Sequence, residues 1–295
     1  MNNSIGIIGL GKMGTAIAER LSGQGFQIEA WTRRGVDAGW ALECGVTGHN
    51  SLATIVECAD IILLSLSDDQ AVSSVLDGLL ETNLEGLLIV DCSTVNPAIH
   101  TAFAARIDAA GAQLLDAPIS GWPIMVTQGK AGIYIGGQAS DVDRFLPVAG
   151  AMSNRIHYVG PLGHGMAAKI VNNMMLASYW QCLREALQVG KSAGLSGDKM
   201  LEILTGSPAA NGVLALKVPV ILGESTPPSF TVSGIVSDLA MFNDVAMSAG
   251  IDAPALGAAL KSFMRHEETG AGEEDFVSMV AAALKDSPMD SKDVL

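Results

Sequence analysis

The stretch Ile5-Gly6-Ile7-Ile8-Gly9-Leu10-Gly11-Lys12-Met13-Gly14 decides the fold class of this 295-residue chain. Its apolar start predicts a buried strand, and its last six residues fit G-x-G-x-x-G, the pattern that joins such a strand to a helix at a dinucleotide. Gly9 permits a tight turn, Gly11 lets the backbone approach a pyrophosphate, and Gly14 lets the helix pack on the strand. A plain strand-to-helix turn is the simpler alternative, but the flanking strands favour a dinucleotide loop.

The first half of the chain alternates short apolar runs with helix-like stretches. The predicted strands are 5–10, 27–32, 60–66, 86–92, 113–117, 132–136 and 155–159. The predicted helices are 13–23, 52–57, 69–80, 97–109 and a shorter one near 141–149. Several strands are apolar at every position, which is typical of a parallel sheet covered on both faces. This alternation predicts an α/β architecture, a Rossmann-type doubly wound sheet built from right-handed βαβ units.

The pattern changes after Gly160-Pro161-Leu162-Gly163. Residues 166–194 have apolar positions at helical spacing and predict one long helix, and no strand-like alternation follows it. We therefore expect an NADP-binding Rossmann domain over residues 1–163. An all-helical substrate and oligomerisation domain is expected over residues 164–295, joined to the first by the long interdomain helix. The polar residues 286–295 predict a frayed tail.

The charge balance excludes several classes of partner. The chain has 17 basic and 31 acidic residues, a formal net charge of −14, so no nucleic acid is expected as a partner because phosphates need a basic face. An anionic membrane surface is disfavoured for the same reason. With 49% hydrophobic residues the chain is too apolar to be a disordered acidic segment. A soluble, acidic globular protein is the remaining class.

The sequence offers no sign of a disulfide scaffold, a metal site or a targeting segment. The four cysteines are widely separated, and the five histidines have no metal-ligand spacing. No basic residue precedes the first apolar run, so we expect no signal peptide. No apolar run approaches the ~20 residues that span a bilayer, so we expect no membrane partner. These features predict a cytoplasmic protein without a bound metal.

The residues after the second strand indicate which dinucleotide the loop takes. NAD sites usually have an acid there for the ribose 2′-hydroxyl, whereas this strand ends in Trp31-Thr32-Arg33-Arg34. Two guanidinium groups suit a 2′-phosphate by charge and by forked geometry. The sequence therefore favours NADP(H) over NAD(H). The alternative is that these are surface arginines, which suits Arg34 better than Arg33.

Lys169 is the candidate acid–base residue. It precedes Asn173 by four positions on the long helix, so both side chains lie on one helix face. Apolar neighbours should partly desolvate the lysine and lower its pKa toward a useful range. The alternative is a surface lysine whose stem covers an amphipathic helix. Spacing alone does not separate the two interpretations.

Five segments together carry a family resemblance. Gly9–Gly14 looks like a G-L-G-x-M-G loop, Trp31-Thr32-Arg33 like a W/Y-N-R segment, and Asp91–Pro97 like D-x-S-T-x-x-P. Asp116-Ala117-Pro118-Ile119-Ser120-Gly121 is close to D-A-P-V-S-G-G, and Gly163–Asn173 looks like G-x-G-x-x-x-K-x-x-N-N. In this order, over nearly the whole chain, they resemble the β-hydroxyacid dehydrogenase family. That family includes 3-hydroxyisobutyrate dehydrogenases and semialdehyde reductases.

The resemblance implies roles for particular residues. It implies Lys169 as catalytic acid–base, Asn173 as its substrate-positioning companion, and Ser120 with Gly121 as the holders of a substrate carboxylate. The expected cofactor-binding residues are Gly9, Leu10, Gly11, Lys12, Met13, Gly14, Thr32, Arg33, Arg34, Leu66 and Thr94. It also implies a homodimer or homotetramer.

Two departures qualify the expected substrate pocket, to which we assign Trp122, Phe230 and Asp238. Trp122 stands where the family has a second glycine, and Pro123 after it has no N–H to offer a carboxylate. Phe230 and Asp238 keep the family's spacing, but Ser237 replaces a lysine that normally helps to hold the cofactor. Both changes make a larger or more apolar substrate a reasonable hypothesis.

The expected function is hydride transfer between NADP(H) and a small or medium β-hydroxyacid or semialdehyde. An imine reductase is the nearest alternative, because those enzymes resemble this family in fold and cofactor loop. A cationic Lys169 would repel an iminium ion, which argues against that alternative. A catalytically inactive NADP-binding scaffold is the other alternative, and the presence of Lys169, Ser120 and Asn173 argues against it.

Overall fold

The computed structural model describes residues 4–285, which divide into two compact units; residues 1–3 and the expected frayed tail over 286–295 lie outside this range. One unit ends at Asn172 and the other begins at Asn173. The strands of the first unit are β1 (Ser4–Ile8), β2 (Gln27–Trp31), β3 (Val46–Gly48), β4 (Ile61–Leu64), β5 (Leu88–Asp91), β6 (Gln113–Asp116), β7 (Ile119–Ser120), β8 (Gly132–Gly136) and β9 (Arg155–Gly160). Its helices are α1 (Lys12–Gly23), α2 (Ala38–Cys44), α3 (Leu52–Val56), α4 (Asp69–Leu80), α5 (Pro97–Ala109), α6 (Pro123–Thr127) and α7 (Ala139–Met152).

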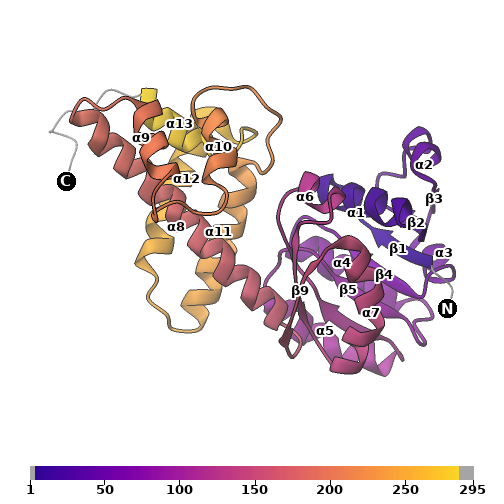
Figure 1. The fold of residues 1–295 in the computed structure, drawn as a ribbon. Coiled ribbons are helices and arrows are strands. Elements are labelled where there is room, and N and C mark those ends of the chain that lie inside the picture. The colour runs from indigo at the N-terminus through magenta and orange to yellow at the C-terminus, as the bar shows by residue number, and fades with distance from the viewer. Residues whose placement is uncertain (1–3, 286–295) are drawn as a thin grey trace. The chain divides into compact units, whose positions relative to one another are not determined.

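Within residues 4–285 the strands form one nine-stranded sheet in the order β3-β2-β1-β4-β5-β6-β8-β7, with β9 also paired to β8. The strands β1 to β6 pair with one another in parallel, and β1 pairs with both β2 and β4. The pairing of β6 with β8 is antiparallel. The order 3-2-1-4-5-6 is that of the Rossmann fold, whose ligands bind where the strand order reverses. The expected α/β doubly wound architecture is confirmed (Figure 1).

Helices cover both faces of the sheet, as the apolar strands require. The helix α1 packs against α2, α6 and α7, while α4 packs against α3 and α5. Every residue of β1, β4 and β5 is buried. Because both faces are covered, these strands read as continuous apolar runs rather than as alternating patterns.

The structure contains elements that the sequence did not predict, and each is short. Asp37 caps α2 through a hydrogen bond from the Trp40 N–H, and Gly45 ends it at φ +66°. The brief strand β3 follows directly. The two-residue strand β7 and the helix α6 come from residues 119–127. Their lengths are below those at which apolar periodicity becomes readable.

The second unit is helical, as expected. The long helix α8 (His164–Ser192) begins in the first unit and continues in the second. It starts two residues before the predicted Met166, so Gly165 belongs to its first turn. The other helices are α9 (Gly197–Thr205), α10 (Leu214–Ile221), α11 (Val232–Ser248), α12 (Pro254–His266), the π-helical η1 (Glu267–Ala271) and α13 (Ser278–Lys285).

Aromatic side chains organise the core of the second unit. Trp180 of α8 is fully buried and meets the ring of Phe276 edge-on, with 5.5 Å between centroids. Phe230 approaches the same Phe276 ring at 6.3 Å. Lys217 is also buried, and its ammonium group contacts Asp275 at 2.6 Å. None of the helices that residues 4–285 form has the length and apolarity to cross a bilayer.

Candidate active site

The loop between β1 and α1 has the geometry that its three glycines predict. Gly9 has a φ of +99°, and its N–H donates to the Trp31 carbonyl oxygen at 2.9 Å. A Cβ on Gly9 would collide with the Ser65 carbonyl oxygen, and a Cβ on Gly14 would collide with the carbonyl oxygen of Gly9. Chain packing therefore explains these two glycines without reference to a ligand.

Gly11 differs, because a Cβ built there meets no protein atom within 4 Å. It is the N-cap residue of α1, and no side chain caps this helix. By contrast, Ser51, Asp68 and Asn96 cap α3, α4 and α5 with side-chain oxygens. An open glycine above an uncapped helix terminus leaves N–H groups directed at solvent, which is the environment that a pyrophosphate needs. The N–H groups at the start of α1 therefore fit the pyrophosphate of a dinucleotide.

The remaining loop residues expected at the cofactor differ in exposure. Lys12 is exposed, whereas Leu10 and Met13 are half-buried and pack against the core of the unit. Leu66 follows β4, and its N–H donates to the Ser93 hydroxyl at 3.0 Å. Thr94 comes next in the chain after Ser93 and is half-buried. Leu66 and Thr94 therefore follow the carboxyl ends of the adjacent strands β4 and β5, beside the point where the strand order reverses.

A buried acidic network supports the Ser93 turn. The Asp91 carboxylate accepts from the Ser93 N–H at 2.9 Å and contacts His100 Nε2 at 2.8 Å. The side chains of Asp91 and His100 are both fully buried. Burial lowers the pKa of His100, but the hydrogen bond to Asp91 and the charges of Asp91, Asp116 and Asp69 outweigh it, so the pKa is raised. The pKa of His100 is thus raised above its ordinary value by the carboxyl groups around it, of which Asp91 is in direct contact.

The arginines proposed for the 2′-phosphate lie in the turn after β2. Arg33 and Arg34 are both exposed, and the Gly35 N–H closes the turn onto the Thr32 carbonyl oxygen at 2.9 Å. The acid within β2, Glu29, contacts His49 Nε2 at 2.7 Å. The pKa of Asp68 is lowered chiefly by the Ser67 hydroxyl, with a smaller contribution from the charge of Arg33. Arg33 therefore lies within electrostatic reach of the loop after β4.

Asp116 fastens the start of α8 to the end of β6. Its fully buried carboxylate accepts from the Gly163 N–H at 2.7 Å and from the Met166 N–H at 2.6 Å. Burial raises the pKa of Asp116, while the charge of His100 and these two N–H groups oppose that rise. The carboxylate also complements the partial positive charge at the helix terminus. The strand end and the helix that carries Lys169 are thus joined by a charged cap.

Lys169 is buried, with 7% of its surface exposed, and its Nζ donates to the Ile119 carbonyl oxygen at 2.7 Å. The alternative of a surface lysine is therefore wrong. Ile119 is the residue before Ser120, so the ammonium group meets the backbone of the segment expected to hold substrate. Gly121, at φ +149°, follows in a conformation that favours glycine. The structure brings Lys169 to the Ser120–Gly121 segment.

Trp122 is the N-cap residue of α6, and its carbonyl oxygen accepts from the Met125 N–H at 2.8 Å. Pro123 occupies the first position of that helix, where a missing N–H costs nothing and the fixed φ is favourable. The Trp-Pro departure from the family pattern therefore has a local structural role.

Three of the predicted site residues, Asn173, Phe230 and Asp238, belong to the second unit. Asn173 Nδ2 donates to the Asp238 carboxylate at 3.3 Å, so two of the predicted residues meet. Ser237, which stands where the family has lysine, is exposed on α11. Phe230 is half-buried against Phe276. Its ring packs in the core of the unit.

Sequence reasoning assigned no role to Asp91, His100 or Asp116. The available signal was an aspartate at the end of each of two consecutive apolar strands, a position where burial requires a partner. Nothing in the sequence pattern indicated that His100, six residues after Thr94, is that partner for Asp91.

Comparison with known proteins gives the family. Residues 4–160 match the model described as the NAD binding domain of 6-phosphogluconate dehydrogenase, and residues 163–283 match NAD-binding of NADP-dependent 3-hydroxyisobutyrate dehydrogenase. Glyoxylate/succinic semialdehyde reductase 1 of Arabidopsis thaliana is 27% identical over 281 residues, which cover 94% of this chain and 97% of the relative.

Solved structures agree with these matches. The 3-hydroxyisobutyrate dehydrogenase of Mycobacterium tuberculosis, determined with L-serine, has a TM-score of 0.86 at 25% identity and covers 96% of this chain and 99% of its own. An imine reductase from Pseudomonas sp. shares the fold at a TM-score of 0.63 and 19% identity, covering 95% of this chain and 98% of its own. From its family matches, the chain belongs to the β-hydroxyacid dehydrogenase family and is an oxidoreductase with a nicotinamide cofactor.

Proposed function

We propose that this protein is an NADP(H)-dependent oxidoreductase that transfers a hydride between the nicotinamide and a small or medium β-hydroxyacid or semialdehyde. Lys169 is the general acid–base: its ammonium group protonates the oxygen of the carbonyl being reduced, and its neutral amine takes the hydroxyl proton in the reverse direction. A bound nicotinamide supplies or accepts the hydride. The observation that carries this proposal is the buried Lys169 ammonium group held at the Ile119–Ser120 backbone.

Substrate orientation is assigned to Ser120 and Gly121, with Asn173 as the companion of Lys169. The Ile119 carbonyl fixes the ammonium group at one place, which is the positional control that acid–base transfer requires. Relatives named as semialdehyde reductases support an aldehyde on a carboxylate-bearing substrate as the reacting group. Trp122, Phe230 and Asp238 are proposed to shape the pocket, and the bulk of Trp122 favours a substrate larger than the smallest hydroxyacids.

The cofactor is bound by the residues from Gly9 to Gly14 together with Thr32, Leu66 and Thr94, and Arg33 and Arg34 select NADP(H). Support comes from the open Gly11, the uncapped α1 and the absence of an acid at the end of β2.

R33D should invert the ratio of kcat/KM for NADPH over NADH, because a carboxylate repels the 2′-phosphate and accepts from the 2′-hydroxyl. R155Q, which removes an exposed arginine from β9, should leave the ratio unchanged. An unchanged ratio in R33D would contradict NADP(H) selection by this residue.

The test of the function is NADPH consumption against a panel of semialdehydes, 2-oxoacids and cyclic imines. Turnover of semialdehydes at least tenfold faster than that of the imines is the expected result. Preference for cyclic imines would replace the proposal with imine reduction. Tight NADPH binding with no turnover of any substrate would favour an inactive scaffold.

We also propose a role for each domain, an oligomeric state and a cellular compartment. We assign cofactor binding to residues 1–163 and substrate binding and assembly to residues 164–295, in a cytoplasmic homodimer or homotetramer. Exposed apolar side chains on the second unit support self-association, among them Met175, Val189 and Met247 at 71%, 70% and 68% exposure. Sedimentation equilibrium distinguishes the two assemblies, and a monomer at micromolar concentration would contradict both.

A further inference from the structure

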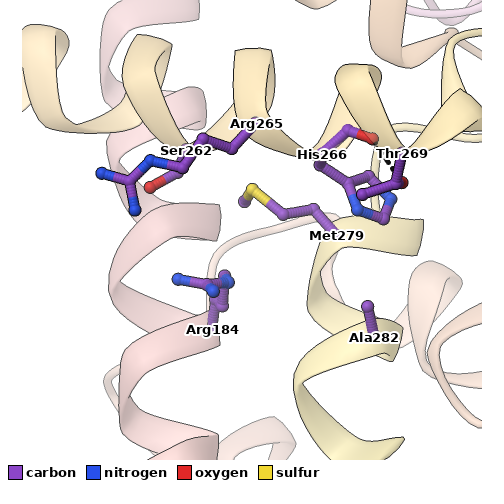
Figure 2. A pocket seen from close by; sticks show the side chains of 7 residues that line it. All are labelled: Arg184, Ser262, Arg265, His266, Thr269, Met279 and Ala282. Atoms are coloured by element: carbon purple, nitrogen blue, oxygen red, sulfur yellow. Dashed lines mark hydrogen bonds between the residues drawn. The ribbon is translucent and has the colours of Figure 1, made fainter. Parts of the chain in front are cut away.

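The second unit carries a polar pocket that no catalytic or cofactor assignment uses. It has a volume of about 200 Å³ and is lined by Arg184, Ser262, Arg265, His266, Thr269, Met279 and Ala282 (Figure 2). All seven residues belong to one unit, so the pocket is defined without reference to the other. Its lining is rich in hydrogen-bond donors, since five of the seven side chains are basic or hydroxyl-bearing.

Three elements bring these donors together. The polar residues are Arg184 of α8, Ser262, Arg265 and His266 of α12, and Thr269 of η1. Figure 2 shows the side chain of Met279, from α13, between Arg184 and Arg265. His266 Nε2 lies 2.8 Å from the Ser278 hydroxyl, which fixes the imidazole against α13. The pocket is thus held by contacts between α12 and α13 and does not depend on a single mobile loop.

The charge of the pocket is unbalanced. Within residues 4–285 neither Arg184 nor Arg265 forms an ion pair with a carboxylate. Among the arginines of residues 4–285 only Arg106 forms such a pair, with Asp77, so the imbalance of the pocket rests on its own lining. No acidic side chain lines the pocket. Two guanidinium groups facing one small space repel each other unless an anion lies between them.

We propose that this pocket binds a phosphate group, free or carried by a small metabolite. Guanidinium groups bind phosphate oxygens through paired, charge-assisted hydrogen bonds, and the Ser262 hydroxyl adds a neutral donor. The Thr269 hydroxyl donates to the His266 carbonyl oxygen at 2.7 Å. Met279 and Ala282 supply an apolar wall against which the organic part of a phosphomonoester packs. Because the bound group contacts α8, α12 and α13 together, it stabilises the folded chain in proportion to its occupancy.

The experiment is isothermal titration of the full-length protein with inorganic phosphate and, separately, glycerol phosphate, at constant ionic strength. The wild type should bind at least one of them saturably with a dissociation constant below about 10 mM, which is weak but specific on the affinity scale. R184Q and R265Q should each weaken binding at least tenfold. K261Q removes an equal charge from the same helix outside the pocket and should bind within twofold of the wild type.

Thermal unfolding of the same proteins gives a second readout of phosphate binding. The midpoint of thermal unfolding should rise with phosphate in the wild type and in K261Q, and not in R184Q or R265Q; sodium chloride at equal ionic strength should raise none of them. Tighter binding of glycerol phosphate would identify a phosphomonoester as the occupant, and equal binding a free phosphate. Absence of saturable binding in the wild type, equal loss in K261Q, or dissociation of an oligomer in R184Q would overturn the proposal. The last result would make the pocket a subunit contact.

Discussion

Gly11 and Gly14 lie in the same loop but differ in what a side chain would meet. The space above Gly11 is open, whereas a Cβ on Gly14 collides with the backbone of Gly9. G11A should therefore change the free energy of unfolding by less than about 1 kcal/mol while weakening NADPH binding at least tenfold. G14A should destabilise the fold by about 1–3 kcal/mol or more, because neighbouring backbone must shift. Urea unfolding and NADPH fluorescence titration separate the two effects; unaltered NADPH affinity in G11A would contradict a pyrophosphate at this position.

His100 makes the stability of the protein depend on pH. Its pKa in the folded state is above the ordinary 6.5, after the hydrogen bond and carboxyl charges outweigh burial. The stabilisation that protonated His100 provides is therefore complete below pH 6.5 and is lost as the pH rises through the folded-state pKa. The free energy of unfolding measured in urea should fall over this window.

A pair of substitutions assigns that fall to His100. H100Q should lower the free energy of unfolding near pH 6 by about 3–5 kcal/mol, since it leaves a buried carboxylate uncompensated, and should flatten the pH dependence. H164Q, which changes an exposed histidine, should keep it. A slope that persists in H100Q would place its origin in another group.

At the scale of elements, the start of α8 determines where Lys169 lies. Asp116 holds that start through the N–H groups of Gly163 and Met166, and Lys169 follows within one helical turn. D116N should cost about 1.5–3 kcal/mol of stability, the range for hydrogen bonds to a charged group. It should also lower kcat at least tenfold with little change in the dissociation constant of NADPH.

The control for this prediction is D37N, which alters the cap of α2 away from Lys169. It should reduce stability by a similar or smaller amount and leave kcat unchanged. A normal kcat in folded D116N would show that the charged cap is structural and does not position the lysine.

The predictability of the elements depended on their length and burial. The strands β1, β4 and β5 were readable because they are fully buried and mostly apolar, and α5 because Asn96 and Pro97 mark its start. The elements α2, β3 and α6 were missed because they have only seven, three and five residues, too few for apolar periodicity to be readable. Lys169 was identified from its segment, but its burial could not be, since that depends on the Ile119 carbonyl fifty residues away.

At the scale of the molecule, the basic residues to which we assign a role are positive groups in a chain whose formal net charge is −14. Arg33 and Arg34 follow β2, Lys169 is buried against β7, and Arg184 and Arg265 line a separate pocket. The first three were evident from the sequence because each belongs to a local motif. The arginine pocket was not, because its residues are eighty positions apart and meet only through helix packing.

The central claim is that Lys169 moves the proton during hydride transfer, and single-turnover kinetics of K169M test it most directly. Methionine keeps the buried apolar stem of the side chain and removes the acid. The rate of NADPH oxidation should fall by at least about 100-fold, the lower end of what general acid–base catalysis contributes, with NADPH affinity within twofold of the wild type. K130M, which alters an exposed lysine of the same unit, should react at the wild-type rate. A K169M rate within tenfold of the wild type would contradict the assignment.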